Sequence, residues 1–334
     1  MTYDVLVIGE ILVELSSAQP LGVSRQFDMS FSGDTLNAAA AAAAAGAKVG
    51  LVACVGDDEF GRSLLSFIEE LGLDRSPIRM VDRPNGIYFT GADPTGAKHF
   101  IYSRQESAGT LLCADDVDEA MTRSPSAVIV SGVTCAISAT AAAAVERAAR
   151  EVNAAGGLVV YDPNYRARLA SPFEARRSFE RLAPYTYLVT PSCPSDSMAM
   201  FGVSDPTEVG SRVRDAGAHL SLVTLGEKGA LLDDGQDLVR FAAASAPSLV
   251  DATGCGDVLV GTLTARLALG DDIDDAIHLS MAAAALSLGG RGGTGYIPFL
   301  EETRALARES RWRAEIPAGT VGQPSTDGQD QPQG

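Results

Sequence analysis

Basic residues are few in this sequence of 334 residues, and only three of them are lysines. Lys and Arg together number 26 against 43 Asp and Glu, so the formal net charge at neutral pH is −17. A surface with this excess of acid repels the phosphates of nucleic acids and anionic lipids. We therefore expect neither nucleic acid nor a membrane as a partner. A metal–nucleotide complex remains compatible, because one local site can be basic on an acidic protein.

Cysteine and histidine are also scarce, and neither shows a metal-binding spacing. The cysteines number five, without a CxxC pair, and the three histidines lie far apart in the chain. An odd number of scattered cysteines is typical of reduced thiols in a cytosolic protein. This usage predicts a cytoplasmic location.

Long hydrophobic runs are missing as well. The longest is the alanine stretch 38–45, far short of the ~20 residues that span a bilayer. No basic segment or signal-type apolar core precedes the first apolar run at 5–8, so we expect a soluble protein. The alanine stretch itself predicts a helix of thin profile that approaches a sheet closely, with meaningless low complexity as the alternative.

Short apolar runs alternate with helical patterns through the first two thirds of the chain. The predicted buried strands are residues 5–8, 49–55, 127–130, 158–161, 187–190 and 220–225. The helical patterns between them are residues 60–71, 138–154, 172–182 and 206–216. Such alternation is typical of a mostly parallel sheet with helices on both faces, so the predicted fold class is α/β.

Two segments, 10–31 and 83–104, do not fit this alternation. The second predicts a hairpin, because Asp-Pro-Thr-Gly at 93–96 has the composition of a turn. We expect both segments to form a small β-sheet lid beside one domain that covers residues 1–312. The open edges of such a sheet often pair with a second copy, so a homo-oligomer can form through it. Residues 317–334 have the composition of a disordered tail.

The segment with the clearest chemical meaning is VDATGCGD, residues 250–257, at the start of an apolar helical pattern. Its glycines permit a tight turn whose backbone N–H groups point outward, and the helix adds the positive end of its dipole. Gly254, Cys255 and Gly256 therefore predict an anion hole for a phosphoryl group in transfer. The P-loop pattern GxxxxGK[ST] is missing from the sequence. Gly254 and Gly256 are followed by a glycine only at Gly261, so this segment does not have the dinucleotide spacing GxGxxG, and it lies late in the chain rather than after the first strand.

Four segments in order resemble motifs of the ribokinase-like (pfkB) carbohydrate kinases, over about residues 3–310. Residues 250–257 resemble the family's DTxGAGD, with Ala252 and Cys255 in place of Thr and Ala. Residues 31–37, FSGDTLN, are similar to the sugar-binding GGxxxN. The other two segments are 55–61, VGDDEFG, and 222–229, LVTLGEKG. The resemblance implies a ribokinase-like fold with a lid, and ATP and Mg²⁺ as cofactors.

The same resemblance implies roles for single residues. It makes Asp257 the catalytic base, Gly33 and Asn37 sugar contacts, and Thr224, Gly226 and Gly229 nucleotide contacts. The family has Asn-x-x-Glu, a motif tied to Mg²⁺, where this chain has Cys193 and Asp196. Asp196 is therefore the residue expected to orient a magnesium-bound water. Residues 282–285, all alanine, either line the adenine pocket or serve helix packing.

Asp257 also has a purely structural interpretation, because acidic residues are favoured in the first turn of a helix. The same helix terminus favours the ionised carboxylate, so we expect the pKa of Asp257 to be lowered. A weak base suffices where the transition state is loose and the proton of the hydroxyl leaves late.

Three segments, 9–15, 83–109 and 162–166, resemble 2-keto-3-deoxygluconate kinases. This resemblance implies that Tyr88, Tyr102, Arg104 and Arg166 face a sugar acid. A guanidinium binds a carboxylate through two hydrogen bonds, which fits the assignment. Since nearly all basic residues here are arginines, solvated surface arginines are the alternative.

Other functions remain open at this stage. The substrate could instead be fructose, ribose or a deoxy-keto sugar acid of inositol breakdown. A sugar-binding sensor that has lost turnover is a different class, favoured by the altered Asn-x-x-Glu segment and disfavoured by the retained Asp257.

Overall fold

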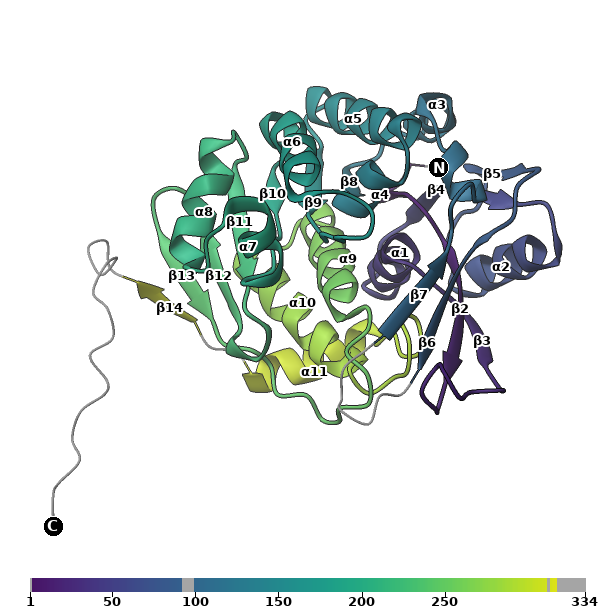
Figure 1. Cartoon of the computed structure of the whole chain (residues 1–334). Coiled ribbons are helices and arrows are strands. Elements are labelled where there is room, and N and C mark those ends of the chain that lie inside the picture. Colours follow the sequence, from purple (N-terminus) through teal and green to yellow (C-terminus); the bar gives the residue numbers. More distant parts are fainter. Residues whose placement is uncertain (1, 92–98, 311–312, 317–334) are drawn as a thin grey trace, which may run out of the picture.

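A computed structural model describes residues 2–91, 99–310 and 313–316, and within these residues ten strands form one sheet (Figure 1). In spatial order they are β14 (Arg313–Ile316), β13 (Leu238–Phe241), β12 (Ala230–Asp233), β11 (Leu220–Thr224), β10 (Leu188–Val189), β9 (Leu158–Asp162), β8 (Ala127–Ser131), β1 (Val5–Ile8), β4 (Val49–Gly56) and β5 (Ile78–Val81). From β11 to β5 all neighbours are parallel, whereas β12, β13 and β14 are antiparallel. The predicted α/β class with a mostly parallel sheet is confirmed; the antiparallel extension was not predicted.

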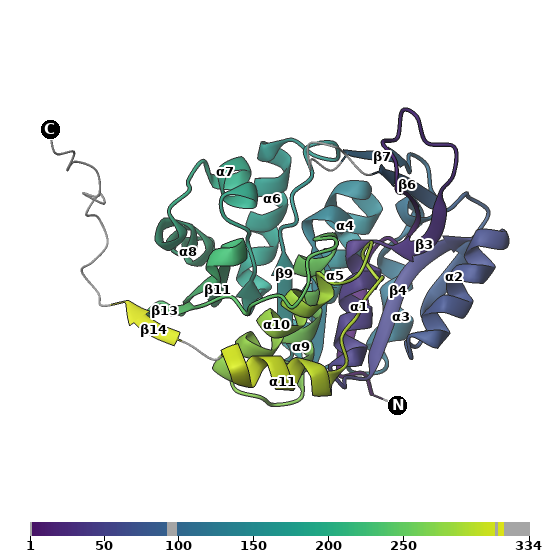
Figure 2. The same cartoon turned by 90° about the horizontal axis from the view of Figure 1, so that it is seen from below.

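Helices cover both faces of the sheet, as Figures 1 and 2 show. One face carries α3 (Ala114–Met121), α5 (Ala139–Ala154), α6 (Pro172–Leu182) and α8 (Pro206–Asp215), with the short α4 (Gly132–Ile137) and α7 (Ser195–Phe201) nearby. The other carries α1 (Asp34–Ala44), α2 (Glu59–Glu70), α9 (Cys255–Ala268) and α10 (Ile273–Ser287), with α11 (Leu300–Ser310) packed on α10. Within the described residues no helix combines the length and the apolar character needed to cross a membrane.

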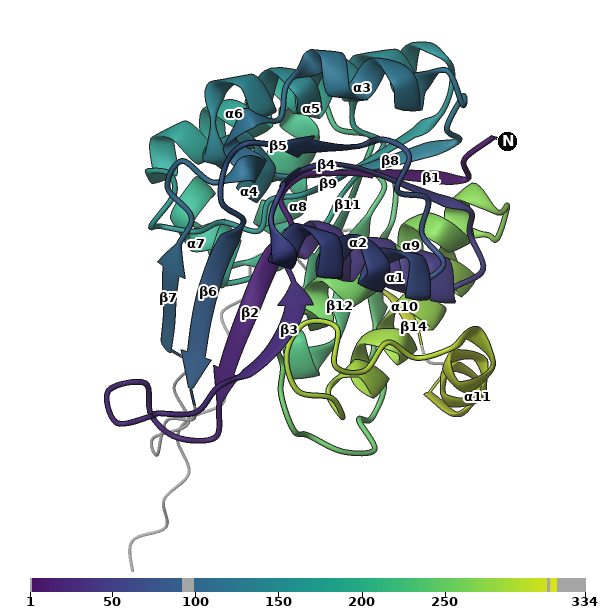
Figure 3. The ribbon, with the colours of Figure 1, turned by 90° about the vertical axis from the view of Figure 1, so that its right-hand side faces the viewer.

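A second, four-stranded sheet lies beside the main one (Figure 3). Its order is β3 (Asp28–Ser32), β2 (Leu12–Ser17), β6 (Gly86–Gly91) and β7 (His99–Ser103). Glu14 pairs with Tyr88 and Tyr88 with Tyr102, so these three side chains share one face. The expected small sheet is therefore present, whereas its expected turn at 93–96 lies outside the described residues.

The alanine-rich helix α1 packs on β1 and β4 and still more extensively against α9. A Cβ atom at Gly261 would overlap the backbone carbonyl of Ala38, so the two helices touch backbone to backbone. Small residues on both helices permit this approach. The contact fixes the start of α1 relative to the start of α9, where the predicted site residues Asn37 and Asp257 lie.

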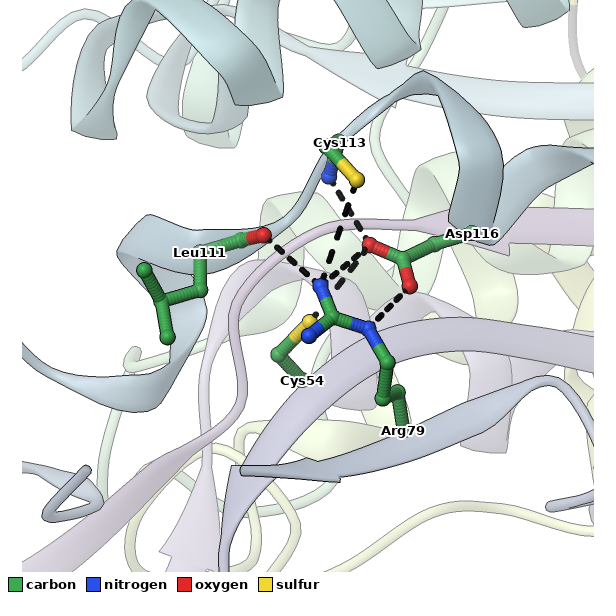
Figure 4. A network of polar contacts seen from close by, with 5 residues as sticks. All are labelled: Cys54, Arg79, Leu111, Cys113 and Asp116. Atoms are coloured by element: carbon green, nitrogen blue, oxygen red, sulfur yellow. Dashed lines mark hydrogen bonds and ion pairs between the residues drawn. The ribbon is translucent and has the colours of Figure 1, made fainter. Parts of the chain in front are cut away.

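A separate polar network, drawn in Figure 4, ties the edge strand β5 to α3. The Arg79 guanidinium donates to both carboxylate oxygens of Asp116 and, at 2.8 Å, to the backbone carbonyl of Leu111. The thiol of Cys54 donates to Asp116, and burial raises the pKa of this thiol to about 12. Within the described residues, none of the five cysteines forms a disulfide bond. None of the five residues of this network lines either of the two cavities described below, so we assign the network to the fold rather than to the site.

Candidate functional site

The site forms where the carboxyl ends of the parallel strands meet the start of α9. Ser131 ends β8, Asp162 ends β9, and Thr224 ends β11. Ligands of open parallel sheets bind at this edge, because the strand ends and helix starts leave polar groups there. Polar residues that directly follow buried strands were the signal in the sequence that could have found Asp162, which was not predicted.

Two cavities open at this edge and share Asp257 and Gly254. The first, of about 340 Å³, is lined by residues that include Ser192, Asp196, Thr224 and Gly256. The second, of about 460 Å³, is lined by residues that include all six predicted sugar contacts: Gly33, Asn37, Tyr88, Tyr102, Arg104 and Arg166. Segments more than 200 residues apart in the sequence thus meet around one carboxylate.

Asp257 is held by two amide side chains. Asn37 Nδ2 donates to its Oδ2 at 2.8 Å, and Asn164 Nδ2 donates to its Oδ1 at 3.3 Å. Burial raises the pKa of Asp257 to about 7, with a further increase from the negative charge of Asp34 and decreases from Asn37, Arg166 and Asn164. The expectation of a lowered pKa was therefore wrong, because desolvation and a like charge outweigh the helix terminus.

Asp34 and Asn164 were not predicted as site residues. Asp34 begins α1, lines the second cavity and accepts a hydrogen bond of 2.6 Å from Ser131 Oγ. Asn164 has φ of 39°, a left-handed conformation that Asn tolerates better than most residues. Asn164 lies just after the end of β9, and its side chain donates the hydrogen bond to Asp257.

At the predicted anion hole the chain enters α9 through a glycine, and Cys255 N donates to the carbonyl of Ala252 at 3.5 Å. Gly254 caps α9 with φ of 80°, and a Cβ atom there would lie 3.0 Å from the backbone of Gly293. The first helical backbone bond runs from Val258 N to Gly254 O at 2.9 Å. The first N–H groups of any helix have no partner inside it, so this terminus can bind an anion.

The residues predicted to contact the nucleotide divide into two groups. Thr224 lines the first cavity, whereas Gly226 and Gly229 follow β11 and are not among its lining residues. Gly229 has φ of 92°, and a Cβ atom there would overlap the carbonyl of Phe241, so the turn itself requires glycine. In residues 282–285, Ala282 and Ala283 are fully buried, and Ala283 packs with Ala41 and Val258. Packing therefore explains these alanines.

Three carboxylates line the first cavity: Asp162, Asp196 and Asp257. Asp196 accepts hydrogen bonds from Ser192 N, Ser192 Oγ and Tyr165 N. The pKa of Asp162 lies well above its usual range because of burial and the charges of Asp196, Asp257 and Asp34. Within the described part of the chain, no three His, Cys, Asp or Glu side chains form a direct metal cage.

The second cavity combines aromatic walls with arginines. The Arg104 guanidinium lies 4.7 Å from the centre of the Tyr102 ring and pairs with Glu10 at 3.0 Å. Tyr88 OH donates to Glu14. Arg168, a further lining residue, donates to the backbone carbonyl of Phe100 at 3.2 Å. Roles for Glu10, Glu14 and Arg168 were not predicted.

A helix terminus capped by glycine, a carboxylate beside it and two adjoining cavities are the features expected of a phosphotransferase that brings two substrates together. A family model described as "pfkB family carbohydrate kinase" matches residues 2–299. The chain belongs to this family of carbohydrate kinases.

Known relatives and structures agree with this assignment. The chain is 33% identical over 312 residues to the 2-dehydro-3-deoxygluconokinase of Thermoproteus tenax, covering 91% of this chain and 94% of the relative. It is 26% identical to the 5-dehydro-2-deoxygluconokinase of Shouchella clausii, with 92% and 96% covered. A crystal structure of a putative ribokinase II from E. coli in complex with ATP and Mg²⁺ has a TM-score of 0.83 at 25% identity, with 92% and 100% covered.

Proposed function

We propose that the protein transfers the γ-phosphoryl group of ATP to a hydroxyl of a small sugar acid. The proposed substrate is 2-keto-3-deoxygluconate, which this reaction converts to its 6-phosphate. The observation that carries this proposal is the sharing of Asp257 and Gly254 by both cavities. An acceptor in the second cavity and a phosphoryl donor in the first would meet at this junction, which Phe100, Asn164, Arg166 and Thr253 also line.

In the proposed reaction the sugar hydroxyl attacks the γ-phosphorus while its proton passes to a carboxylate oxygen of Asp257. The bond between the γ-phosphorus and the β–γ bridging oxygen breaks, and ADP leaves. Asn37 and Asn164 hold the carboxylate in line. The backbone N–H groups at Gly254, Cys255 and Gly256 stabilise the charge on the phosphoryl oxygens. A pKa of Asp257 of about 7 suits a base at neutral pH.

Mg²⁺ fits the donor set of the first cavity. Asp162 and Asp196 would offer hard oxygen ligands. Burial first, and then repulsion from Asp196 and other carboxylates, raises the pKa of Asp162, and a cation would relieve this repulsion. Mg²⁺ keeps several waters, so the lack of a three-residue cage within the described residues agrees with binding through water and phosphate. Bound there, the ion would neutralise phosphate charge.

The arginines of the second cavity favour an acidic substrate. Arg104, Arg166 and Arg168 all line it, on a protein with a strong net negative charge. The relative from Thermoproteus tenax is named 2-dehydro-3-deoxygluconokinase, after a sugar acid that is also called 2-keto-3-deoxygluconate. The second relative favours 5-dehydro-2-deoxygluconate, another keto acid, as the alternative.

A substrate panel with MgATP tests the proposal by release of ADP. We expect 2-keto-3-deoxygluconate to have the highest kcat/KM, 5-dehydro-2-deoxygluconate a lower value, and fructose and ribose the lowest. A preference for a neutral sugar would refute the sugar-acid assignment. Calorimetric binding of sugar and nucleotide without any turnover would instead identify a sensor.

The small sheet, in this proposal, is a lid and also the contact between two copies of the chain. Met29 and Ile101, which lie on β3 and β7, are 49% and 53% exposed. Exposed apolar residues on an edge strand favour an interface with a second copy of the chain, which would bury them. Light scattering of the wild type and of Ile101→Lys tests this: we expect a dimer that the substitution weakens.

A further inference from the structure

Glu10 is a buried charged residue that the proposed reaction does not use. It follows β1 and is 2% exposed. Its Oε2 accepts a hydrogen bond of 3.0 Å from Arg104 Nη1, and its Oε1 accepts one of 2.9 Å from Ser107 Oγ. Glu10 and Ser107 are not among the residues that line the sugar cavity, whereas Arg104 is. The carboxylate therefore lies behind Arg104 as seen from the substrate.

Two glycines make the space that Glu10 occupies. A Cβ atom at Gly109 would lie 2.7 Å from Glu10 Cγ, and one at Gly86 would lie 2.9 Å from Glu10 Oε1. Burial raises the pKa of Glu10, and Arg104 and Ser107 lower it. A buried carboxylate is costly unless it is paired and hydrogen-bonded. A closely fitted site for such a group, next to a cavity, indicates a function beyond packing.

The Arg104 side chain is held on two sides. Glu10 takes one edge of the guanidinium, and the ring of Tyr102 lies against its face. Only 11% of the Arg104 side chain is exposed, so few of its N–H groups remain for a ligand. Fixing a flexible side chain before binding reduces the entropy that binding must overcome. Which N–H groups face the cavity therefore depends on Glu10.

We propose that Glu10 is a positioning residue, which orients Arg104 toward the carboxylate of the substrate. The inference rests on the proposed function, in which the substrate is a sugar acid. Glu10 contacts no reacting atom, so its effect is on KM for the sugar acid and not on kcat. It also acts entirely through Arg104, so it has no effect on KM once Arg104 is removed.

A double-mutant cycle of Glu10→Ala and Arg104→Leu, with 2-keto-3-deoxygluconate and saturating MgATP, tests this inference. We expect Glu10→Ala to raise KM ~10-fold, because one charge-assisted contact is misaligned, with kcat within about two-fold. In the Arg104→Leu protein the same change should raise KM less than about two-fold. Glu10→Gln, which keeps the shape and can still accept a hydrogen bond, should recover part of the loss.

Several results would overturn the proposal, and they are distinguishable. An equal rise in KM in both backgrounds would mean that Glu10 acts on the pocket independently of Arg104. If Glu10→Ala does not fold, the same comparison is made with Glu10→Gln. If Arg104→Leu alone leaves KM for every sugar acid unchanged, Arg104 does not bind the substrate's carboxylate and this inference fails, whereas the sugar-acid function is decided by the substrate panel, because Arg166 and Arg168 also line the cavity. Glu208→Ala, which removes an exposed ion pair with Arg212, is the control and should change nothing.

Discussion

The phosphoryl side and the sugar side of the site are built by different means. The phosphoryl side is a single short segment at the start of α9, and its candidate donors are backbone N–H groups. The sugar side consists of side chains from distant parts of the chain, among them Asn37, Tyr88, Arg104 and Arg166. Backbone donors tolerate a change of side chain, whereas a pocket of side chains changes its substrate with each replacement. Chemistry is thus fixed locally, and specificity is distributed.

Asp257 stands where the two sides meet, and its replacement has the largest expected effect. Asp257→Asn keeps the shape but cannot accept the proton, so kcat should fall by at least ~10². Affinity for nucleotide and sugar, measured by calorimetry, should stay within a few-fold. Turnover close to that of the wild type would contradict the role of Asp257 as the base. It would mean that the reaction does not depend on the carboxylate at which the two cavities meet.

The sugar side should distinguish acids from neutral sugars through Arg166. Replacing it with Leu removes charge-assisted hydrogen bonds, so kcat/KM for 2-keto-3-deoxygluconate should fall ~10–10²-fold. The small activity with fructose should scarcely change. Arg62→Leu, which removes an exposed arginine paired with Asp57, is the matched control. Equal losses on the acid and on fructose would mean that Arg166, which also lines the first cavity, acts on the phosphoryl side or on the structure and not on the substrate's carboxylate.

Asp34 couples the two sides through charge. The base must be ionised, so kcat/KM should fall as the pH decreases below the pKa of Asp257, about 7. Asp34→Asn removes a negative neighbour that raises this pKa, and the acidic limb of the profile should move to lower pH. Asp57→Asn, on the surface, should leave the limb in place. A limb that is unchanged in Asp34→Asn would contradict the coupling.

The smallest effect should come from the phosphoryl side. Cys255→Ala changes a side chain in the candidate anion hole but leaves its backbone N–H groups, so kcat should stay within about two-fold. A large loss would show that the thiol itself contributes, and the contrast between the two sides would be weaker than we infer. Steady-state kinetics at saturating MgATP measure this.

Sequence patterns were sufficient for the parallel centre of the main sheet, because each of these buried strands is a continuous apolar run. The antiparallel β12 and β13 were missed because, within the described residues 220–241, no α-helix separates them from β11, so the alternation of strands and helices does not extend to them. The edge strand β5, with two exposed residues, lacks an apolar run. Edges of a sheet carry a weaker hydrophobic signal than its centre.

The site was predictable where function depends on a contiguous motif and not where it depends on three-dimensional neighbours. Residues 250–257 identified the start of α9. The pKa of Asp257 could not be predicted, because it is set by burial and by Asp34, more than 200 residues away in the sequence. Glu10 was missed for the same reason, because its partners Arg104 and Ser107 lie 94 and 97 residues away in the sequence.

The contact between α1 and α9 also constrains how this protein can evolve. Homopolymeric runs such as the alanines at 38–45 commonly vary in length between related genes. Here one inserted alanine would rotate the helix beyond it by about 100° relative to Asn37, because a helix has 3.6 residues per turn. The hydrogen bond from Asn37 to Asp257 at the start of α1, and the one from Arg266 Nη1 of α9 to the carbonyl of Ala45 at its end, could not then both be kept. A segment that resembles a neutral repeat should therefore show a fixed length under purifying selection.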